Sequence, residues 1–145
     1  MLRIAIFLHQ LDATGVALNA MALGRHMRSV GWDVVMVTVR RGGALSKNLD
    51  GLQHEVLGGW RLSRSKELAL SVPALRCFLN ALAPDVILSA GNHAHFALLV
   101  ATTGALSRRT VYRFSNDLTH EDAKGRRGTC FRRIVAKLIA KRAAR

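Results

Sequence analysis

Three short apolar runs, each leading into polar residues, constrain the fold of this chain most strongly. They are LRIAIFLH (2–9), DVVMVTV (33–39) and DVILSA (85–90). Runs that are apolar throughout are typical of parallel strands buried on both faces. Helical patterns alternate with them, at 14–32, 63–83 and 93–105. This alternation predicts βαβ units, and so an α/β fold with a Rossmann-like parallel sheet and helices on both faces.

Weaker patterns complete the predicted element order. QHEVLGG (53–59) is expected to form an edge strand, RTVYRFS (109–115) a further strand, and CFRRIVAKLIAKRAAR (130–145) a final helix. Pro73 lies inside the second helical pattern and is expected to kink or split it. At 145 residues the chain is predicted to be one domain.

Positive charge is concentrated at the end of the chain. The formal net charge is +13, and residues 124–145 hold nine Lys and Arg with no Asp or Glu. The preceding 13 basic and 9 acidic residues leave only +4. A nucleic-acid-binding domain is expected to be basic over a whole face and to offer aromatic rings, which make up only 6% of this chain. No nucleic-acid partner is therefore predicted.

The sequence also bears on where the protein resides. No apolar run reaches the roughly 18 residues of a membrane span. The N-terminal run is shorter than a signal peptide requires, and no small-residue cleavage site follows it. Cys77 and Cys130 lack metal-type spacing and are expected to be reduced thiols. These features predict a cytoplasmic protein.

Polar loops follow three of the predicted strands. They are HQLDATG (9–15), SAGNHAH (89–95) and SNDLTHED (115–122). The carboxyl ends of parallel strands meet at one edge of an open sheet, and ligands bind there at the topological switch point. We therefore expect that edge to gather Asp12, Thr14, Gly15, Asn92, His93, His95, Ser115, Asn116 and Asp117.

Several of these residues permit two interpretations. Asn92 is placed to cap the following helix, to line a ligand site, or to do both. Gly15 gives a turn conformational freedom, or lets an anion approach the start of a helix. His93 and His95 are two residues apart and share no helix face, so no metal site is predicted, and His95 is expected to be scaffold.

Well-known catalytic and nucleotide-binding motifs are absent from the sequence. It contains no GxGxxG after the first strand, no GxxxxGK[ST] and no GxSxG. No carboxylates are paired at catalytic spacing, and no catalytic residue is assigned. Neither a dinucleotide-dependent dehydrogenase nor a P-loop NTPase is supported.

Three segments resemble family 4 glycosyltransferases of the GT-B fold. Residues 1–43 are similar to the opening strand, Gly-containing loop and helix of that family, with Gly31-Trp32-Asp33-Val34 entering the second strand. APDVILSAGNHAHFALLVA (83–101) and RRTVYRFSNDLTH (108–120) are similar to the segments leading into its interdomain cleft. The resemblance covers essentially the whole chain.

The resemblance implies that residues 1–145 form the N-terminal, acceptor-side domain of a two-domain enzyme. Such enzymes transfer a sugar from a nucleotide-sugar, UDP- or GDP-linked, to a glycan or lipid-linked acceptor during polysaccharide biosynthesis. They retain configuration and need no metal or other cofactor. The donor-binding C-terminal domain, with its paired glutamates, lies outside these residues. The chain is thus expected to be inactive alone. It is expected to be a fragment, a frame-shortened gene product, or one half of a split enzyme with that domain as a separate partner.

The resemblance also suggests roles for substrate-binding residues. The loop containing Asp12, Thr14 and Gly15 would face the donor diphosphate and the acceptor. Asn92 and His93 would rim the acceptor side. The stretch from Ser115 through Asn116 to Asp117 would border the reacting sugar. An alternative is a non-catalytic Rossmann-like module for ligand binding or interaction.

The final helix has two compatible interpretations. Its apolar residues recur at helical spacing and are expected to pack on the sheet with the charges in solvent. Its basic surface is also suited to an anionic membrane, which predicts a peripheral position on the inner face of the cell membrane through residues 124–145. The apolar residues in question are Phe131, Ile134, Val135, Leu138 and Ile139.

Overall fold

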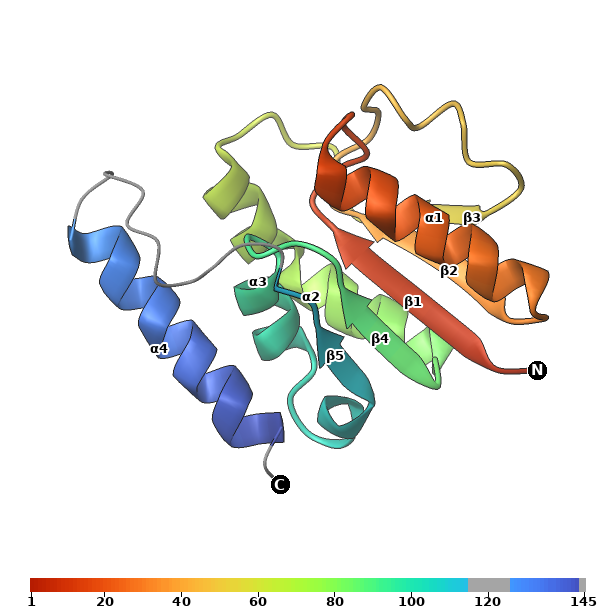
Figure 1. Ribbon diagram of the computed structural model, residues 1–145. Helices are drawn as coiled ribbons and strands as arrows, with labels where there is room; N and C mark the ends of the chain where they lie inside the picture. Colours follow the sequence, from red (N-terminus) through yellow and green to blue (C-terminus); the bar gives the residue numbers. More distant parts are fainter. Residues whose placement is uncertain (115–125, 144–145) are drawn as a thin grey trace.

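The computed structural model describes residues 1–114 and 126–143 and contains a five-stranded sheet (Figure 1). Every paired neighbour in the order β3-β2-β1-β4-β5 is parallel. The predicted Rossmann-like α/β fold is therefore confirmed. The strands are β1 (Arg3–Leu8), β2 (Asp33–Thr38), β3 (Gln53–Val56), β4 (Val86–Ser89) and β5 (Thr110–Tyr112).

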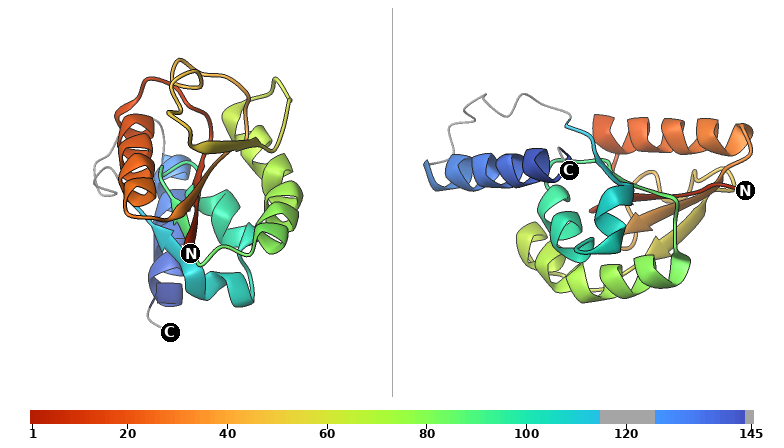
Figure 2. Two further views of the ribbon diagram at one scale, coloured as in Figure 1. Left: turned by 90° about the vertical axis from the view of Figure 1, so that its right-hand side faces the viewer. Right: turned by 90° about the horizontal axis from the view of Figure 1, so that it is seen from below.

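Helices cover both faces of this sheet. They are α1 (Gly15–Ser29), α2 (Arg64–Leu82), α3 (His95–Ala101) and α4 (Arg126–Ala143), with a 3₁₀ turn η1 (Ala105–Arg109) before β5. Figure 2 shows α1 on one face and α2 with α3 on the other. None of the helices in the described ranges is long and apolar enough to cross a bilayer.

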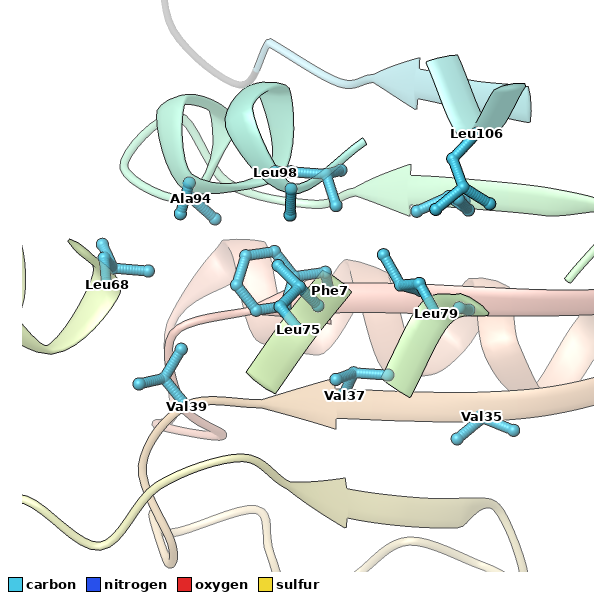
Figure 3. Close-up of a cluster of buried hydrophobic side chains, with 14 residues drawn as sticks. Phe7, Val35, Val37, Val39, Leu68, Leu75, Leu79, Ala94, Leu98 and Leu106 are labelled. Atoms are coloured by element: carbon cyan, nitrogen blue, oxygen red, sulfur yellow. The ribbon is translucent and has the colours of Figure 1, made fainter. Parts of the chain in front are cut away.

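The central strand β1 explains why the strand sequences are apolar throughout. Its successive side chains point to opposite faces. Phe7 enters the core beneath α2 and α3, where Leu75, Leu79 and Leu98 surround it (Figure 3). Ile6 enters the core beneath α1. Because both faces are covered, neither set of side chains can be polar.

Helix α2 runs unbroken through Pro73, so of the two predicted outcomes, a kink or a split, the split is wrong. A proline inside a helix costs about 3 kcal/mol through a lost hydrogen bond and a steric clash. Leu68, Leu75 and Leu79, on both sides of the proline, are buried against the sheet. Their packing against the sheet on both sides of the proline offsets that cost.

Helix α4 lies beside α3 (Figure 1) but buries only part of its apolar surface. Val135 and Ile139 form a small core with Leu99. Ile134 and Leu138 are 51% and 48% exposed. The prediction that the whole apolar face packs inward is therefore wrong for these two, because adjacent positions are about 100° apart around a helix and α3 covers one stripe. The side chain of Phe131 lies outside the described residues.

Candidate functional site

The loops that follow β1 and β4 meet at the carboxyl edge of the sheet. The Ala90 amide donates to the Phe7 carbonyl at 3.0 Å, which continues the pairing with β1 one residue past the end of β4. A Cβ atom on Gly91 would lie 3.2 Å from Cγ1 of Val16 at the start of α1. The first two polar loops are thus neighbours. The third loop, with Ser115, Asn116 and Asp117, lies outside the described residues.

Thr14 and Gly15 form the start of α1. Thr14 is the N-cap, and its hydroxyl accepts a hydrogen bond from the Ala17 amide at 3.3 Å. A Cβ atom on Gly15 would meet no atom of the described residues within 4 Å. Gly15 has no positive φ either, so neither packing nor turn geometry requires glycine there. As far as residues 1–114 and 126–143 are concerned, the first turn of α1 therefore borders open space at the positive end of the helix dipole.

Asp12 lies in the same loop and faces a basic side chain from the end of β2. Its carboxylate accepts from the Gln10 amide group, and its carbonyl accepts from the Thr14 amide at 2.7 Å. The pKa of Arg40 is raised above its usual value, chiefly by hydrogen bonds to Glu67 and in smaller part by the charge of Asp12. Asp12 thus stabilises the backbone turn before α1, and its negative charge stabilises the charged form of Arg40 at this edge of the sheet.

Glu67 forms the most connected polar cluster at this edge, and sequence analysis did not identify it. It is fully buried in the first turn of α2. Its carboxylate lies 2.6 Å from Arg40 Nη2 and 2.8 Å from His9 Nε2, and it accepts from the Leu62 amide at 3.0 Å. The hydrogen bonds from Arg40, opposed by burial, lower the pKa of Glu67 to about 2. The cluster ties the ends of β1 and β2 to the start of α2.

A glutamate in the first turn of a helix ordinarily faces solvent and stabilises the helix dipole. Nothing in the local sequence distinguishes Glu67 from such a residue. The only available signal was indirect: His9 and Arg40 directly follow two buried strands, so both reach the edge where α2 begins. Among the described residues, Nδ1 of His9 is buried without a hydrogen-bond partner.

Asn92 and His93 precede α3 without capping it. The Ala94 amide donates to the Gly91 carbonyl at 2.9 Å and closes a turn over these residues. That turn delays the helix, so α3 begins at His95 and the capping position is Ala94. The predicted capping role of Asn92 is therefore wrong. Asn92 is half-buried and His93 is exposed.

His95 belongs to the core, as predicted for a scaffold residue. Its Nδ1 lies 2.7 Å from the Ser89 hydroxyl, and the rings of Tyr112 and Phe114 pack edge-on against it. Burial lowers the pKa of His95 to about 4. Exposed His93 and buried His95 occupy different surroundings. Within residues 1–114 and 126–143, no three His, Cys, Asp or Glu side chains form a group that could hold a metal.

Comparison with known proteins relates this fold to glycosyltransferases. The sequence matches no protein-family model and no curated protein. The structure is similar to Phytolacca americana UGT2 complexed with UDP-2fluoro-glucose and pterostilbene, with a TM-score of 0.63 at 13% identity over 81% of this chain. It is also similar to Acinetobacter baumannii MurG, with a TM-score of 0.60 at 10% identity over 95% of this chain.

The two similar proteins are GT-B glycosyltransferases. The fold is of the GT-B type. The matched region spans 31% of the UGT2 chain and 39% of the MurG chain. The similarity is one of fold, and identities of 13% and 10% carry no information on individual site residues.

Proposed function

We propose that this chain is the acceptor-side part of a family 4 glycosyltransferase. The reaction moves a sugar from a UDP- or GDP-linked donor to a glycan or lipid-linked acceptor, with retention of configuration. One observation carries the proposal: a GT-B-type sheet brings two polar loops together at its carboxyl edge, beside the uncovered first turn of α1. Ligands of open α/β sheets bind at this edge.

The proposal gives the loop before α1 the role of an anion-facing wall. A diphosphate near Gly15 would meet the first-turn amides and the positive end of the helix dipole. Asp12 and Thr14 hold that loop in shape through their backbone and capping hydrogen bonds. No side chain at position 15 stands between the helix and a ligand.

The loop after β4 would line the acceptor side in this proposal. His93 is exposed, and Gly91 in the same loop lies next to Val16 of α1, which suits a group that orients an acceptor hydroxyl. Asn92 is proposed to line the same side. Ser115, Asn116 and Asp117 are proposed to border the transferred sugar on the strength of the sequence resemblance alone.

Donor binding is proposed to require a second domain, because the matched region corresponds to about a third of each similar protein. Closure of two walls around the reacting sugar positions it and excludes water. Residues 1–145 alone are then expected to transfer no sugar.

The test is a transfer assay with radiolabelled UDP- and GDP-sugars. The 145-residue chain is assayed alone and together with any donor-binding domain encoded beside it, recognised by an E-x7-E motif. Transfer only in the combined sample supports the proposal. Robust transfer by the chain alone would contradict the proposal that donor binding requires a second domain. No coherent donor domain and no transfer in any sample favours a non-catalytic Rossmann-like binding module.

We also propose that the protein is peripheral on the cytoplasmic face of a membrane, where lipid-linked acceptors reside. The support is the surface of α4, on which Arg133, Lys137 and Lys141 are exposed beside Ile134 and Leu138. Basic residues are attracted to anionic headgroups, and apolar neighbours add affinity by entering the interface.

A further inference from the structure

The segment between β3 and α2 is held at two backbone atoms of one residue. The Leu62 amide donates to Glu67 at 3.0 Å, and the Leu62 carbonyl accepts from Arg40 Nη2 at 2.9 Å. Both partners belong to the buried carboxylate cluster. Burying a carboxylate is costly unless it is fully hydrogen-bonded, so this cluster is a rigid anchor. The segment that ends at Leu62 is therefore fixed in space, although it lacks regular secondary structure.

Trp60 lies within that fixed segment and packs on the backbone of Gly58. A Cβ atom on Gly58 would lie 2.5 Å from Cζ3 and 2.6 Å from Cε3 of the indole ring. Any larger residue at 58 would displace the ring. The same Cβ would lie 3.1 Å from the Val39 carbonyl, so Gly58, on which the indole packs, lies beside the residue that follows β2. One side of Trp60 is thus supported by backbone, while the side chain stays 39% exposed.

The exposed indole lies at the ligand-binding edge of the sheet. The loop after β3 and the loop after β1 lie at the same end of the molecule in both views (Figures 1 and 2). Backbone contacts agree, because the Val39 amide donates to the His9 carbonyl at 3.1 Å and the Val39 carbonyl adjoins Gly58. A single exposed aromatic residue needs no explanation by itself. An exposed aromatic residue that packs on backbone, two residues before the anchored Leu62, is a preorganised surface.

We propose that Trp60 is a stacking platform for the apolar face of a pyranose ring, and thus an acceptor-binding residue. Axial C–H groups give one face of a pyranose an apolar, weakly positive surface that complements the negative face of an indole. Holding the ring in place beforehand removes the entropy cost of ordering it on binding. The role of the bound sugar as acceptor rests on the proposed function, whereas the stacking itself requires no transfer.

The experiment records the indole N–H signals of Trp32 and Trp60 in the ¹⁵N-labelled 145-residue chain. The probes are methyl β-D-glucopyranoside and methyl α-D-mannopyranoside. Trp32 directly precedes β2, at the opposite edge of the sheet, and serves as the internal reference. We expect at least one probe to shift the Trp60 signal and leave Trp32 unchanged. Saturation transfer is expected to be strongest at the axial protons of the sugar.

Two variants separate stacking from general binding. Trp60→Ala is expected to weaken probe binding about tenfold, with Trp60→Phe in between. Arg40→Lys keeps the positive charge but loses the forked contact to Glu67 and Leu62, so it is expected to weaken binding with the indole intact. Any of three results overturns the inference. They are unchanged probe affinity in Trp60→Ala, equal shifts of the Trp32 and Trp60 signals, and no binding of either probe. Absence of sugar transfer with stacking intact counts against the proposed enzyme only.

Discussion

The imidazole of His95 and the hydroxyl of Ser89 are 2.7 Å apart inside the core, where α3 begins beside the end of β4. His95 is 1% exposed, and Tyr112 and Phe114 pack edge-on against its ring. Such surroundings disfavour a charged imidazole, and burial lowers the pKa of His95 from 6.5 to about 4. The neutral ring therefore belongs to the native state near neutral pH.

This pair predicts a loss of stability in mild acid. Between pH 6.5 and about 4 the unfolded chain binds a proton at His95 and the folded chain does not. The free energy of unfolding should therefore fall through that window, by up to about 3 kcal/mol. His95→Gln removes the titration and should flatten this part of the profile. Urea unfolding at a series of pH values measures this loss of stability. A signal of the His95 imidazole that titrates near 6.5 in the folded protein would contradict the prediction.

The Glu67 carboxylate predicts a second acid-sensitive window. Its pKa is about 2 in the folded protein against an ordinary 4.5, so its stabilisation is present above 4.5 and is lost as the pH falls towards 2. Glu67→Gln should destabilise the protein by roughly 3 kcal/mol at neutral pH, because it leaves Arg40 and His9 without their charged partner. It should also flatten the profile below pH 4.5. Glu55→Gln, at an exposed position on β3, is the matched control for losing a carboxylate and should change stability little.

The buried strands and the helices between them could be predicted because hydrophobic pattern dictates burial directly. Every residue of the run from Ile4 to Leu8 is at most 3% exposed, as a strand covered on both faces requires. The hydrophobic pattern alone does not predict how much of the apolar face of a helix is buried against another element. Leu18 lies in the helical pattern at 14–32, yet it is 51% exposed on α1, and on α4 Ile134 is 51% and Leu138 48% exposed.

The candidate site was predictable only in part. Topology brings the loops after β1 and β4 together, and the contact of Gly91 with Val16 follows from it. The start of α3 depended instead on one local turn, closed by the Ala94 amide, which propensities do not reveal. The partners of Glu67 lie 27 and 58 residues away in sequence. Only the three-dimensional structure brings Arg40 and His9 to it.

Gly15→Ala gives a sharp test of the ligand-facing role of the first turn of α1. The added methyl group meets no described atom, and alanine favours helix over glycine by up to about 1 kcal/mol. The melting temperature should therefore stay the same or rise. Transfer in the combined enzyme should fall at the same time, because the methyl group occupies ligand space. Unchanged transfer would show that no ligand approaches this turn. Gly31→Ala is the contrasting variant, since φ is +90° there and the change should destabilise the fold without touching the site.

His93→Ala should reduce transfer more than stability. His93 is exposed, so its loss removes little packing, whereas a group that positions a reacting hydroxyl is worth roughly 10²-fold in rate. Asn116→Ala is expected to behave in the same way by family resemblance. His26→Ala, at an exposed position in the last turn of α1, is the control and should leave transfer unchanged. A lower melting temperature in His93→Ala with full activity per folded molecule would make His93 a structural residue.

The outward surface of α4 differs from a fully solvated helix face. Arg133, Lys137 and Lys141 are four residues apart and form one exposed row, and Ile134 and Leu138 form an exposed apolar row beside it. Val135 and Ile139 already hold the helix against α3, so the outward rows are not needed for packing. A basic row next to an apolar row is typical of helices that lie in a membrane interface.

We therefore predict salt-sensitive binding to anionic vesicles and none to neutral ones. Each basic residue near an anionic surface contributes on the order of 1 kcal/mol, so changing the three α4 residues to Gln should lower binding by about two orders of magnitude. The control changes Lys47, Arg64 and Lys66 to Gln, which removes the same charge from exposed positions outside α4 and should matter much less. Vesicle sedimentation at low and high salt measures both. Equal binding to anionic and neutral vesicles, or binding that salt leaves unchanged, would contradict the electrostatic mechanism. That result would assign the vesicle binding to the outward apolar row of α4.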